Sequence, residues 1–176
     1  EINSEARYIY RVSDDLHAIN SHPLVIETEN HIANNFDIIS TPSKYIYDKL
    51  SRFPSTLLQH HGIRKDLFDK NYSNPYKRGI NAVFVGNSHF DYNFIEHASK
   101  LFPDWYFHII GPIPDLPTRK NIVTYGEMPF HETISYIKYA DIGLQTLSYA
   151  PGCESFTDSL KVIQYTYCRL PIVAPA

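Results

Sequence analysis

Cysteine is scarce in this sequence, with only Cys153 and Cys168 among 176 residues. Two cysteines are too few for a disulfide-dense secreted scaffold, and they form no Cys-x-x-Cys motif for redox chemistry. The sequence also lacks the ~20-residue apolar run that a membrane-spanning helix needs. It contains no Gly-x-Gly-x-x-Gly or Walker A string, which argues against a dinucleotide-dependent oxidoreductase and a P-loop nucleotidase.

The sequence also lacks a large excess of positive or of negative charge, since the net charge is only -3. The sequence therefore has no basic footprint for binding nucleic acid. Nine histidines are present, but no Cys/His cluster has the spacing of a structural zinc site. What the sequence does have is a 43% hydrophobic content, with 14 tyrosines and 10 phenylalanines. This content is enough for a buried core, and it excludes a disordered chain.

Both ends of the sequence indicate a fragment of a longer protein. It begins at Glu1 without an initiator methionine or a signal-peptide pattern. It ends at Ala176, directly after the strand-like run 171–175. A buried strand at that position normally has further chain to cover it, so we expect parts of the protein to lie outside this sequence.

Strand and helix patterns alternate in both halves of the sequence, around a polar segment at residues 64–80. The expected strands are 7–12, 37–41, 56–59, 81–85, 105–110, 122–125, 141–147 and 171–174, and the expected helices are 23–36, 44–53, 92–102, 130–140 and 158–169. Alternating strands and helices predict the α/β class, with parallel sheets that bind ligands beyond the carboxyl ends of their strands. Residues 64–80 have no sustained period and predict an interdomain linker or a long loop.

The helix expected at 158–169 is the first candidate for a ligand site. Leu160, Lys161 and Gln164 lie on one side of its first turns, and Asp158 or Ser159 could cap it. A helix N-terminus suits a diphosphate because it presents free N–H groups and a partial positive charge. Lys161 would add a full charge, and Gln164 could bind ribose or sugar hydroxyls. The alternative is that Lys161 and Gln164 form a solvated helix face.

Several sequence strings resemble GT-B glycosyltransferases, in particular the GumK-type (xanthan) β-glucuronosyltransferase family. The strings are Val85-Gly-Asn-Ser-His-Phe-Asp91, Phe107-His-Ile-Ile-Gly111, Val123-Thr-Tyr-Gly-Glu-Met128, Ile134-Ser-Tyr-Ile-Lys-Tyr-Ala140 and Asp158-Ser-Leu-Lys-Val-Ile-Gln-Tyr165. The resemblance runs almost continuously from residue 64 to the end and reaches back more weakly to 10–14 and 61–62. The Gly-Glu-Met and Lys-x-x-Gln pieces, in that order, make it fairly specific.

The resemblance implies two Rossmann-like domains that face each other across a cleft. Residues 1–63 would be the C-terminal part of the acceptor-side domain, and 64–80 the linker. Residues 81–176 would be the donor (UDP-sugar)-binding domain, truncated at its C-terminus.

The resemblance also implies a set of nucleotide-sugar contacts. Carried over by motif, they are Ser88, Glu127, Met128, Leu160, Lys161 and Gln164. The family has a further tyrosine before the Lys-x-x-Gln helix. An ungapped match places Thr146 there, and Tyr149 is the candidate if the loop is shifted. Ser88 and Leu160 stand where the family pattern has methionines. For Glu127, the alternative is a cap on the helix at 130–140, with Pro129 near its start.

The general base of the family corresponds to Asp14 in Arg11-Val-Ser-Asp14. A base is needed because the acceptor hydroxyl must lose its proton as it attacks the anomeric carbon. The mechanism implied is a single displacement without a covalent intermediate. Asp15 is the fallback for this role, and the alternative for both aspartates is a turn or helix cap after a strand.

The function implied is inverting transfer of a sugar, glucuronic acid by resemblance, from a UDP-sugar to a lipid-diphosphate-linked oligosaccharide in exopolysaccharide biosynthesis. No metal and no cofactor are expected. The protein would be cytoplasmic, in peripheral contact with the inner face of the cell membrane. Two alternatives stay open: a retaining GT-B hexosyltransferase, against which Gln164 counts because those families favour glutamate near this helix, and a nucleotide-sugar-binding module without catalysis.

Overall fold

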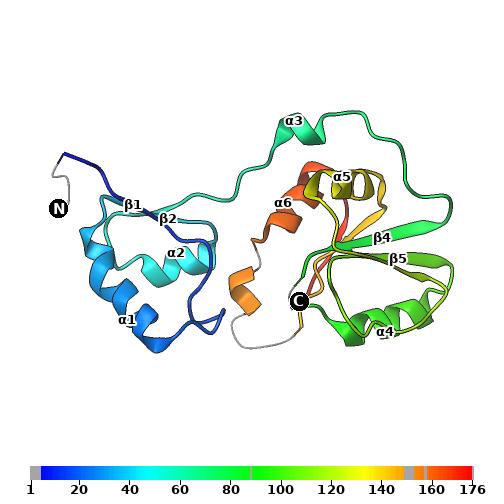
Figure 1. The fold of residues 1–176 in the computed structure, drawn as a ribbon, viewed down its shortest axis with the longest axis horizontal. Coiled ribbons are helices and arrows are strands. Elements are labelled where there is room, and N and C mark those ends of the chain that lie inside the picture. The colour runs from blue at the N-terminus through cyan, green and yellow to red at the C-terminus, as the bar shows by residue number, and fades with distance from the viewer. Residues whose placement is uncertain (1–4, 88, 149–152, 157, 176) are drawn as a thin grey trace. The chain divides into compact units, whose positions relative to one another are not determined.

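The computed structural model describes residues 5–87, 89–148, 153–156 and 158–175. The chain forms two compact units (Figure 1). Unit 1 comprises Glu1–His61 and Ala150–Ser159, and unit 2 comprises Gly62–Tyr149 and Leu160–Ala176. The units therefore divide the chain differently from the predicted boundaries, because residues 64–80 belong to unit 2 and residues 150–159 to unit 1.

Unit 1 is built on a parallel sheet of three strands in the order β1-β2-β3. Its elements are β1 (Ile9–Arg11), α1 (Pro23–Ile32), η1 (Ala33–Asn35), β2 (Ile38–Thr41), α2 (Lys44–Leu50), β3 (Thr56–Leu58) and η2 (Cys153–Phe156). The core of the unit is the buried set Val12, Ala33, Ile39, Ile46, Leu50 and Phe53. No residue of α1 is buried within the unit, whereas Ile46 and Leu50 turn one face of α2 into the core.

Helix α2 receives two capping oxygens at its N-terminus. Ser43 Oγ accepts from the Ile46 N–H at 3.2 Å, and Asp158 Oδ2 accepts from the Lys44 N–H at 3.1 Å. The first N–H groups of any helix lack intrahelical partners, and Asp158 satisfies one of them in α2. That Asp158 or Ser159 caps the helix at 158–169 stays a prediction.

Unit 2 contains a sheet of five parallel strands in the order β6-β5-β4-β7-β8. Its elements are α3 (Lys65–Phe68), β4 (Ile80–Val85), α4 (Tyr92–Leu101), β5 (Trp105–Ile110), β6 (Ile122–Gly126), α5 (Phe130–Tyr139), β7 (Ile142–Leu144), α6 (Leu160–Tyr167) and β8 (Ile172–Val173). The chain moves outward from β4 to β6 and then returns to the other side of β4 for β7. The order reverses between β4 and β7, which makes this place the topological switch point.

Helices cover both faces of this sheet, as the alternation of side chains along β4 requires. Ala82 and Phe84 point to the face with α4, and Val83 points to the face with α5 and α6. Helix α4 begins where Asp91 Oδ1 accepts from the Phe94 N–H at 2.9 Å. The α/β class with parallel sheets is therefore confirmed. Among the described residues, no helix has both the length and the apolarity required to cross a membrane.

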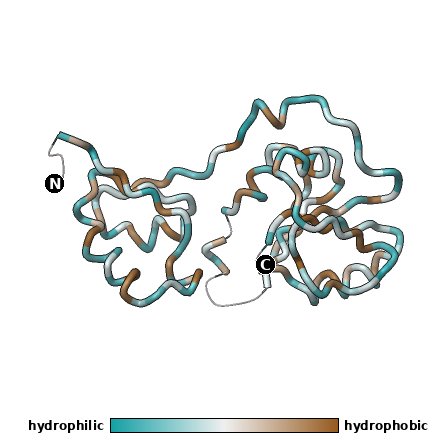
Figure 2. Tube along the Cα trace, viewed as in Figure 1, coloured by the Kyte–Doolittle hydropathy of each residue, from teal (hydrophilic) through white to brown (hydrophobic). Residues whose placement is uncertain are grey.

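Residues 64–80, called the strap below, pack onto unit 2 and do not form a free linker. Figure 2 shows the strap as mostly hydrophilic apart from its stretch at α3. There Phe68 is buried in the core beside α5. Tyr76 donates from its hydroxyl to Tyr136 O at 2.7 Å, and Lys138 Nζ donates to Phe68 O at 2.7 Å. Of the two predicted alternatives, an interdomain linker and a long loop, the strap fits the second, and long-range contacts hold it on unit 2.

A buried histidine lies under the strap, in the middle of β5. His108 Nε2–H donates to Asn81 Oδ1 at 3.0 Å, and its Nδ1 accepts from the Tyr125 hydroxyl at 2.8 Å. This tautomer follows because Asn81 Nδ2 already donates to Gly79 O, which leaves Oδ1 as the acceptor. Burial lowers the pKa of His108 to about 4.

His108 should make the stability of unit 2 depend on pH. The unfolded chain takes up a proton on this histidine below pH ~6.5, whereas the folded protein keeps the ring neutral down to about pH 4. The free energy of unfolding is therefore highest above pH ~6.5 and falls with the pH. Between pH 7 and pH 5 it should fall by about 2 kcal/mol. Urea unfolding at both pH values should show this loss in the wild type and a smaller one in His108→Gln. The exposed His97→Gln is the control, and an unchanged loss in His108→Gln would contradict the prediction.

Candidate active site

The candidate site of unit 2 lies at the carboxyl ends of its strands, around the switch point between β4 and β7. Open parallel sheets bind ligands in this crevice because the crossing connections leave it uncovered. Glycines stand at three neighbouring strand ends: Gly86 follows β4, Gly111 follows β5 and Gly126 ends β6. Without side chains there, a ligand can approach the backbone closely.

These glycines also hold the strand ends against one another. The Gly86 N–H donates to Ile110 O at 3.0 Å, and the Gly111 N–H donates to Gly126 O at 2.8 Å. Gly111 has φ +138°, and a Cβ built on it would lie 1.8 Å from Gly86 O. Only glycine fits at position 111, so the edge of the site depends on it.

Lys161 brings a positive charge to this edge from α6. Its Nζ lies 4.3 Å from the centroid of the Phe84 ring and 3.2 Å from the place of a Cβ on Gly86. The side chain is half-buried, and burial lowers its pKa to about 8. Among the described residues it has no ion-pair partner. A solvated helix face does not fit this position, whereas a cation without a counterion suits an anionic ligand.

The other two positions of the motif flank Lys161 on α6. Leu160 begins the helix and is 49% exposed, and Gln164 lies one turn further on and is half-buried. The structure therefore brings Leu160, Lys161 and Gln164 together on one helix, with Lys161 directed to the end of β4.

Glu127 and Met128 follow the edge strand β6. Glu127 is exposed, and α5 has Pro129 as its N-cap residue with no side-chain capping bond. The capping alternative for Glu127 was therefore wrong, and its carboxylate faces solvent. Met128 is half-buried and packs against the core beside α5, so packing limits its contact with a ligand.

Two of the predicted contacts, Ser88 and Tyr149, lie outside the described residues. The segments next to them contact each other across the switch point. Phe90 forms a bridge with Leu147, and the Ser148 N–H donates to His89 O at 2.7 Å. Sequence patterns did not indicate this tie, because it joins two loops that are far apart in the chain.

In unit 1, the two adjacent aspartates after β1 have different surroundings. Asp15 is buried: its Oδ1 accepts from the His17 N–H at 3.0 Å and pairs with Lys49 Nζ. Asp14 is exposed. The turn-cap interpretation therefore holds for Asp15, whose carboxylate is already occupied, whereas the carboxylate of Asp14 is open to solvent.

Asp14 and His61 both follow strands at the carboxyl end of the unit 1 sheet, where the sequence showed a weak resemblance at 10–14 and 61–62. Burial lowers the pKa of His61, the Arg11 charge lowers it further, and the Asp14 charge opposes both. The Arg11 guanidinium donates to Ser40 Oγ at 3.3 Å and to Gln59 Oε1 at 3.4 Å. A carboxylate, an arginine and a histidine thus lie within electrostatic range of one another in unit 1.

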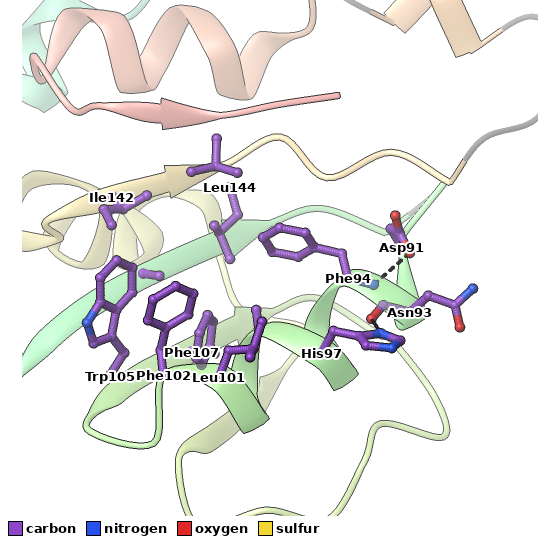
Figure 3. Close-up of a pocket in the computed structure, with 13 residues that line it drawn as sticks. Asp91, Asn93, Phe94, His97, Leu101, Phe102, Trp105, Phe107, Ile142 and Leu144 are labelled. Carbon is purple, nitrogen blue, oxygen red and sulfur yellow. Dashed lines mark hydrogen bonds between the residues drawn. The ribbon is translucent and has the colours of Figure 1, made fainter. Parts of the chain in front are cut away.

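An apolar groove of about 520 Å³ lies elsewhere in unit 2, between α4 and the sheet (Figure 3). Trp105 and Phe102 lie at one end and Asn93 and Asp91 at the other. Neither Gly86 nor Lys161 lines it. Its lining suits hydrophobic groups and not a diphosphate, so it is not the candidate site. Among the described residues, no three His, Cys, Asp or Glu side chains gather as metal ligands.

Known proteins resemble this chain in sequence. The model of the family "Glucuronosyltransferase GumK, N-terminal domain" matches residues 1–42. The chain is 33% identical over 177 residues to the UDP-glucuronate:glycolipid 2-beta-glucuronosyltransferase of Xanthomonas campestris pv. campestris. That match covers 99% of this chain and 44% of the relative, so the chain spans less than half of the relative's length.

A solved structure shows the same fold. A sucrose-phosphate synthase from Thermosynechococcus elongatus superposes with a TM-score of 0.64 over 93% of this chain and 46% of that one, at 16% sequence identity. This likeness concerns the fold alone, and it agrees with the parallel sheets described above. The resemblance read from the sequence strings is thus confirmed: the chain is similar in sequence to a GumK-type glucuronosyltransferase and has the GT-B fold.

Proposed function

We propose that this chain belongs to an inverting glycosyltransferase that moves glucuronic acid from UDP-glucuronate to a lipid-diphosphate-linked oligosaccharide in exopolysaccharide biosynthesis. The observation that carries the proposal is the Lys161 ammonium, half-buried beside Gly86 and without an ion-pair partner among the described residues. The relative's name supports both the donor and a glycolipid acceptor. Since the chain spans 44% of that relative, the activity of the whole protein is part of the proposal.

In this proposal the diphosphate lies at the ends of β4 and β7, held by the Lys161 ammonium and the first N–H groups of α6. The exposed carboxylate of Glu127 accepts hydrogen bonds from the ribose hydroxyls. Strand β5 separates β6 from β4, so the ends of these two strands are about 10 Å apart at ordinary strand spacing. A nucleotide can span that distance, whereas a lone phosphate cannot.

Transfer is a single displacement in which Asp14 acts as the base. The acceptor oxygen bonds to the anomeric carbon while the bond from that carbon to the UDP oxygen breaks, and the hydroxyl proton moves to the Asp14 carboxylate. The leaving diphosphate carries the negative charge, which Lys161 stabilises. Asp14 is favoured over Asp15 because the carboxylate of Asp15 is already bound to Lys49 and the His17 N–H.

A lipid-linked acceptor implies that the enzyme works at a membrane surface. We propose that it is a peripheral protein at the cytoplasmic face of the membrane. A retaining hexosyltransferase is the second enzyme candidate, and the anomeric configuration of the product distinguishes the two.

Lys161→Met should weaken UDP binding by about 1–3 kcal/mol, because the variant keeps the packing and loses the ammonium. Wild-type affinity should also fall as the pH rises above about 8, where free Lys161 loses its proton. Isothermal titration calorimetry on the full-length protein, with Mg²⁺ or with EDTA, measures both effects.

The exposed pair of Lys100 with Glu96 provides a matched control, Lys100→Met, which should bind UDP like the wild type. Equal affinity of Lys161→Met and the wild type would remove the basis of the proposed donor site. A requirement for Mg²⁺ would contradict the metal-free mechanism.

A further inference from the structure

A second cavity of unit 2 lies under the strap, against the face of the sheet that α5 covers. Its volume is about 280 Å³, close to the lower limit of ~300 Å³ for small-molecule sites. The strap and the strands β4, β5 and β6 line it with Pro75, Tyr76, Lys77, Arg78, Asn81, Tyr106, His108, Val123 and Tyr125. None of the residues assigned to the proposed donor site lines this cavity, so the two sites are separate.

The wall of the cavity is aromatic and is fixed by the fold. The ring centroids of Tyr76 and His108 are 4.5 Å apart, and those of His108 and Tyr125 are 5.9 Å apart. The hydroxyls of the two tyrosines are used within unit 2: Tyr76 donates to Tyr136 O at 2.7 Å, and Tyr125 donates to His108 Nδ1 at 2.8 Å. These side chains therefore offer a ligand their apolar ring surfaces, which suit the C–H face of a sugar ring.

The strap places a guanidinium at the rim of the cavity. Arg78 Nε donates to the Tyr106 hydroxyl at 3.0 Å, and the guanidinium carbon lies 5.9 Å from the centroid of that ring. Gly79 permits this close approach, because its φ is +74° and a Cβ on it would lie 2.9 Å from the Tyr106 ring. The Nε bond orients the guanidinium, and its terminal N–H groups have no acceptor among the described residues.

The charge at the rim is positive and is not balanced. Neither Lys77 nor Arg78 forms an ion pair with any residue that the structure describes. The nearby carboxylate of Asp141 does not line the cavity, and its Oδ2 accepts from the Asn81 N–H at 2.8 Å. Two cations next to an aromatic wall favour an anion that also has an apolar face over a bare inorganic ion.

We propose that this cavity binds one hexuronate residue, with the carboxylate on Arg78 and Lys77 and the C–H face of the pyranose ring against the tyrosine wall. A carboxylate matches the planar fork of a guanidinium, and one sugar ring suits a cavity of this size. Lys77 and Arg78 are exposed, so a hexuronate within a longer glycan can also enter.

The class of ligand follows from the cavity alone. That the glucuronic acid of the glycolipid product supplies it rests on the proposed function. The site would then hold the product glycan on unit 2, apart from the donor. The donor also contains a hexuronate, and the experiment distinguishes these two sources.

The test is an NMR titration of the full-length protein with methyl β-D-glucuronide while UDP saturates the donor site. We expect this probe to bind about tenfold or more tightly than methyl β-D-glucoside, which lacks the carboxylate. Inorganic phosphate, which has charge but no ring, should also bind more weakly. Arg78→Met and Lys77→Met should each lower the affinity for the glucuronide about tenfold, and Arg78→Lys should restore part of the loss.

Arg64→Met is the matched control, because Arg64 lies on the same strap, pairs with Asp66 and does not line the cavity. It should bind the glucuronide like the wild type. Lys77 has no ion pair within the described residues, so Lys77→Met still tests the site if Arg78→Met lowers the melting temperature.

Three results would each overturn the inference: wild-type affinity in Arg78→Met, equal affinity for the glucuronide and the glucoside, or phosphate bound as tightly as the glucuronide. A glucuronide that binds only without UDP occupies the donor site, which would overturn this inference and leave the proposed function standing. A protein that binds the glucuronide but not UDP would refute the proposed function and leave this site standing.

Discussion

Replacing Asp14 with asparagine should lower the rate of sugar transfer by about 100- to 10,000-fold, the usual contribution of a general base. Asparagine keeps the size of the side chain but cannot accept the proton of the acceptor hydroxyl. Binding of UDP should not change, because Asp14 belongs to unit 1 and Lys161 to unit 2. Single-turnover transfer assays and calorimetry on the same full-length preparation measure the two quantities separately.

Asp15→Asn is the informative comparison for this experiment. Because Asp15 is buried and paired with Lys49, its loss should lower the stability of unit 1. If Asp14→Asn kept its rate while Asp15→Asn lost activity without losing stability, the assignment of the base would be reversed. If neither variant lost activity, neither aspartate would be the base. A wild-type protein that binds UDP but transfers no sugar would make the module without catalysis the better interpretation.

Gly111→Ala should destabilise unit 2 by at least about 3 kcal/mol, from the combined costs of backbone strain and overpacking. The φ of +138° disfavours any side chain, and the added Cβ would lie 1.8 Å from Gly86 O. Relief of this clash would separate the ends of β4 and β5, which form the edge of the proposed donor site. We therefore expect the variant to lose UDP affinity along with stability.

Substitutions of two further glycines separate the cost of backbone strain from the cost of overpacking. Gly126 has φ +67° with no atom within 4 Å of its Cβ position, so Gly126→Ala should show the cost of strain alone. Gly62 has neither a positive φ nor a close neighbour, so Gly62→Ala should be close to neutral. Urea unfolding followed by circular dichroism ranks the three. A Gly111→Ala variant as stable as Gly62→Ala would show that the packing of the strand ends described here is wrong.

The fold of unit 2 could be read from the sequence wherever apolar runs and turn residues agreed. The runs at 81–85 and 105–110 are buried strands, as predicted, because parallel strands covered on both faces need continuous apolar residues. Strand β7 was predicted as 141–147 but ends at Leu144. Beyond Leu144 the chain leaves the sheet ladder to meet Phe90, and no local pattern encodes a partner so distant in sequence.

The site was predictable only in part, for a related reason. Lys161 could be found because its helix follows a strand and a loop, a local arrangement that shows in the sequence. The difference between Asp14 and Asp15 could not be predicted from the sequence, because it depends on Lys49, which lies 34 residues from Asp15.

The contacts of the strap have a practical consequence for domain exchange between related enzymes. A crossover at residue 81 would separate Phe68 from the core that it fills and would replace the strap whose carbonyl groups accept from Lys138. The junction should instead fall between His61 and Gly62, where the two units meet in the chain. Residues 150–159 belong to unit 1, so they should come from the same parent as residues 1–61. A faithful chimera of this chain therefore needs three junctions, and one with a single junction would take the two segments of unit 1 from different parents.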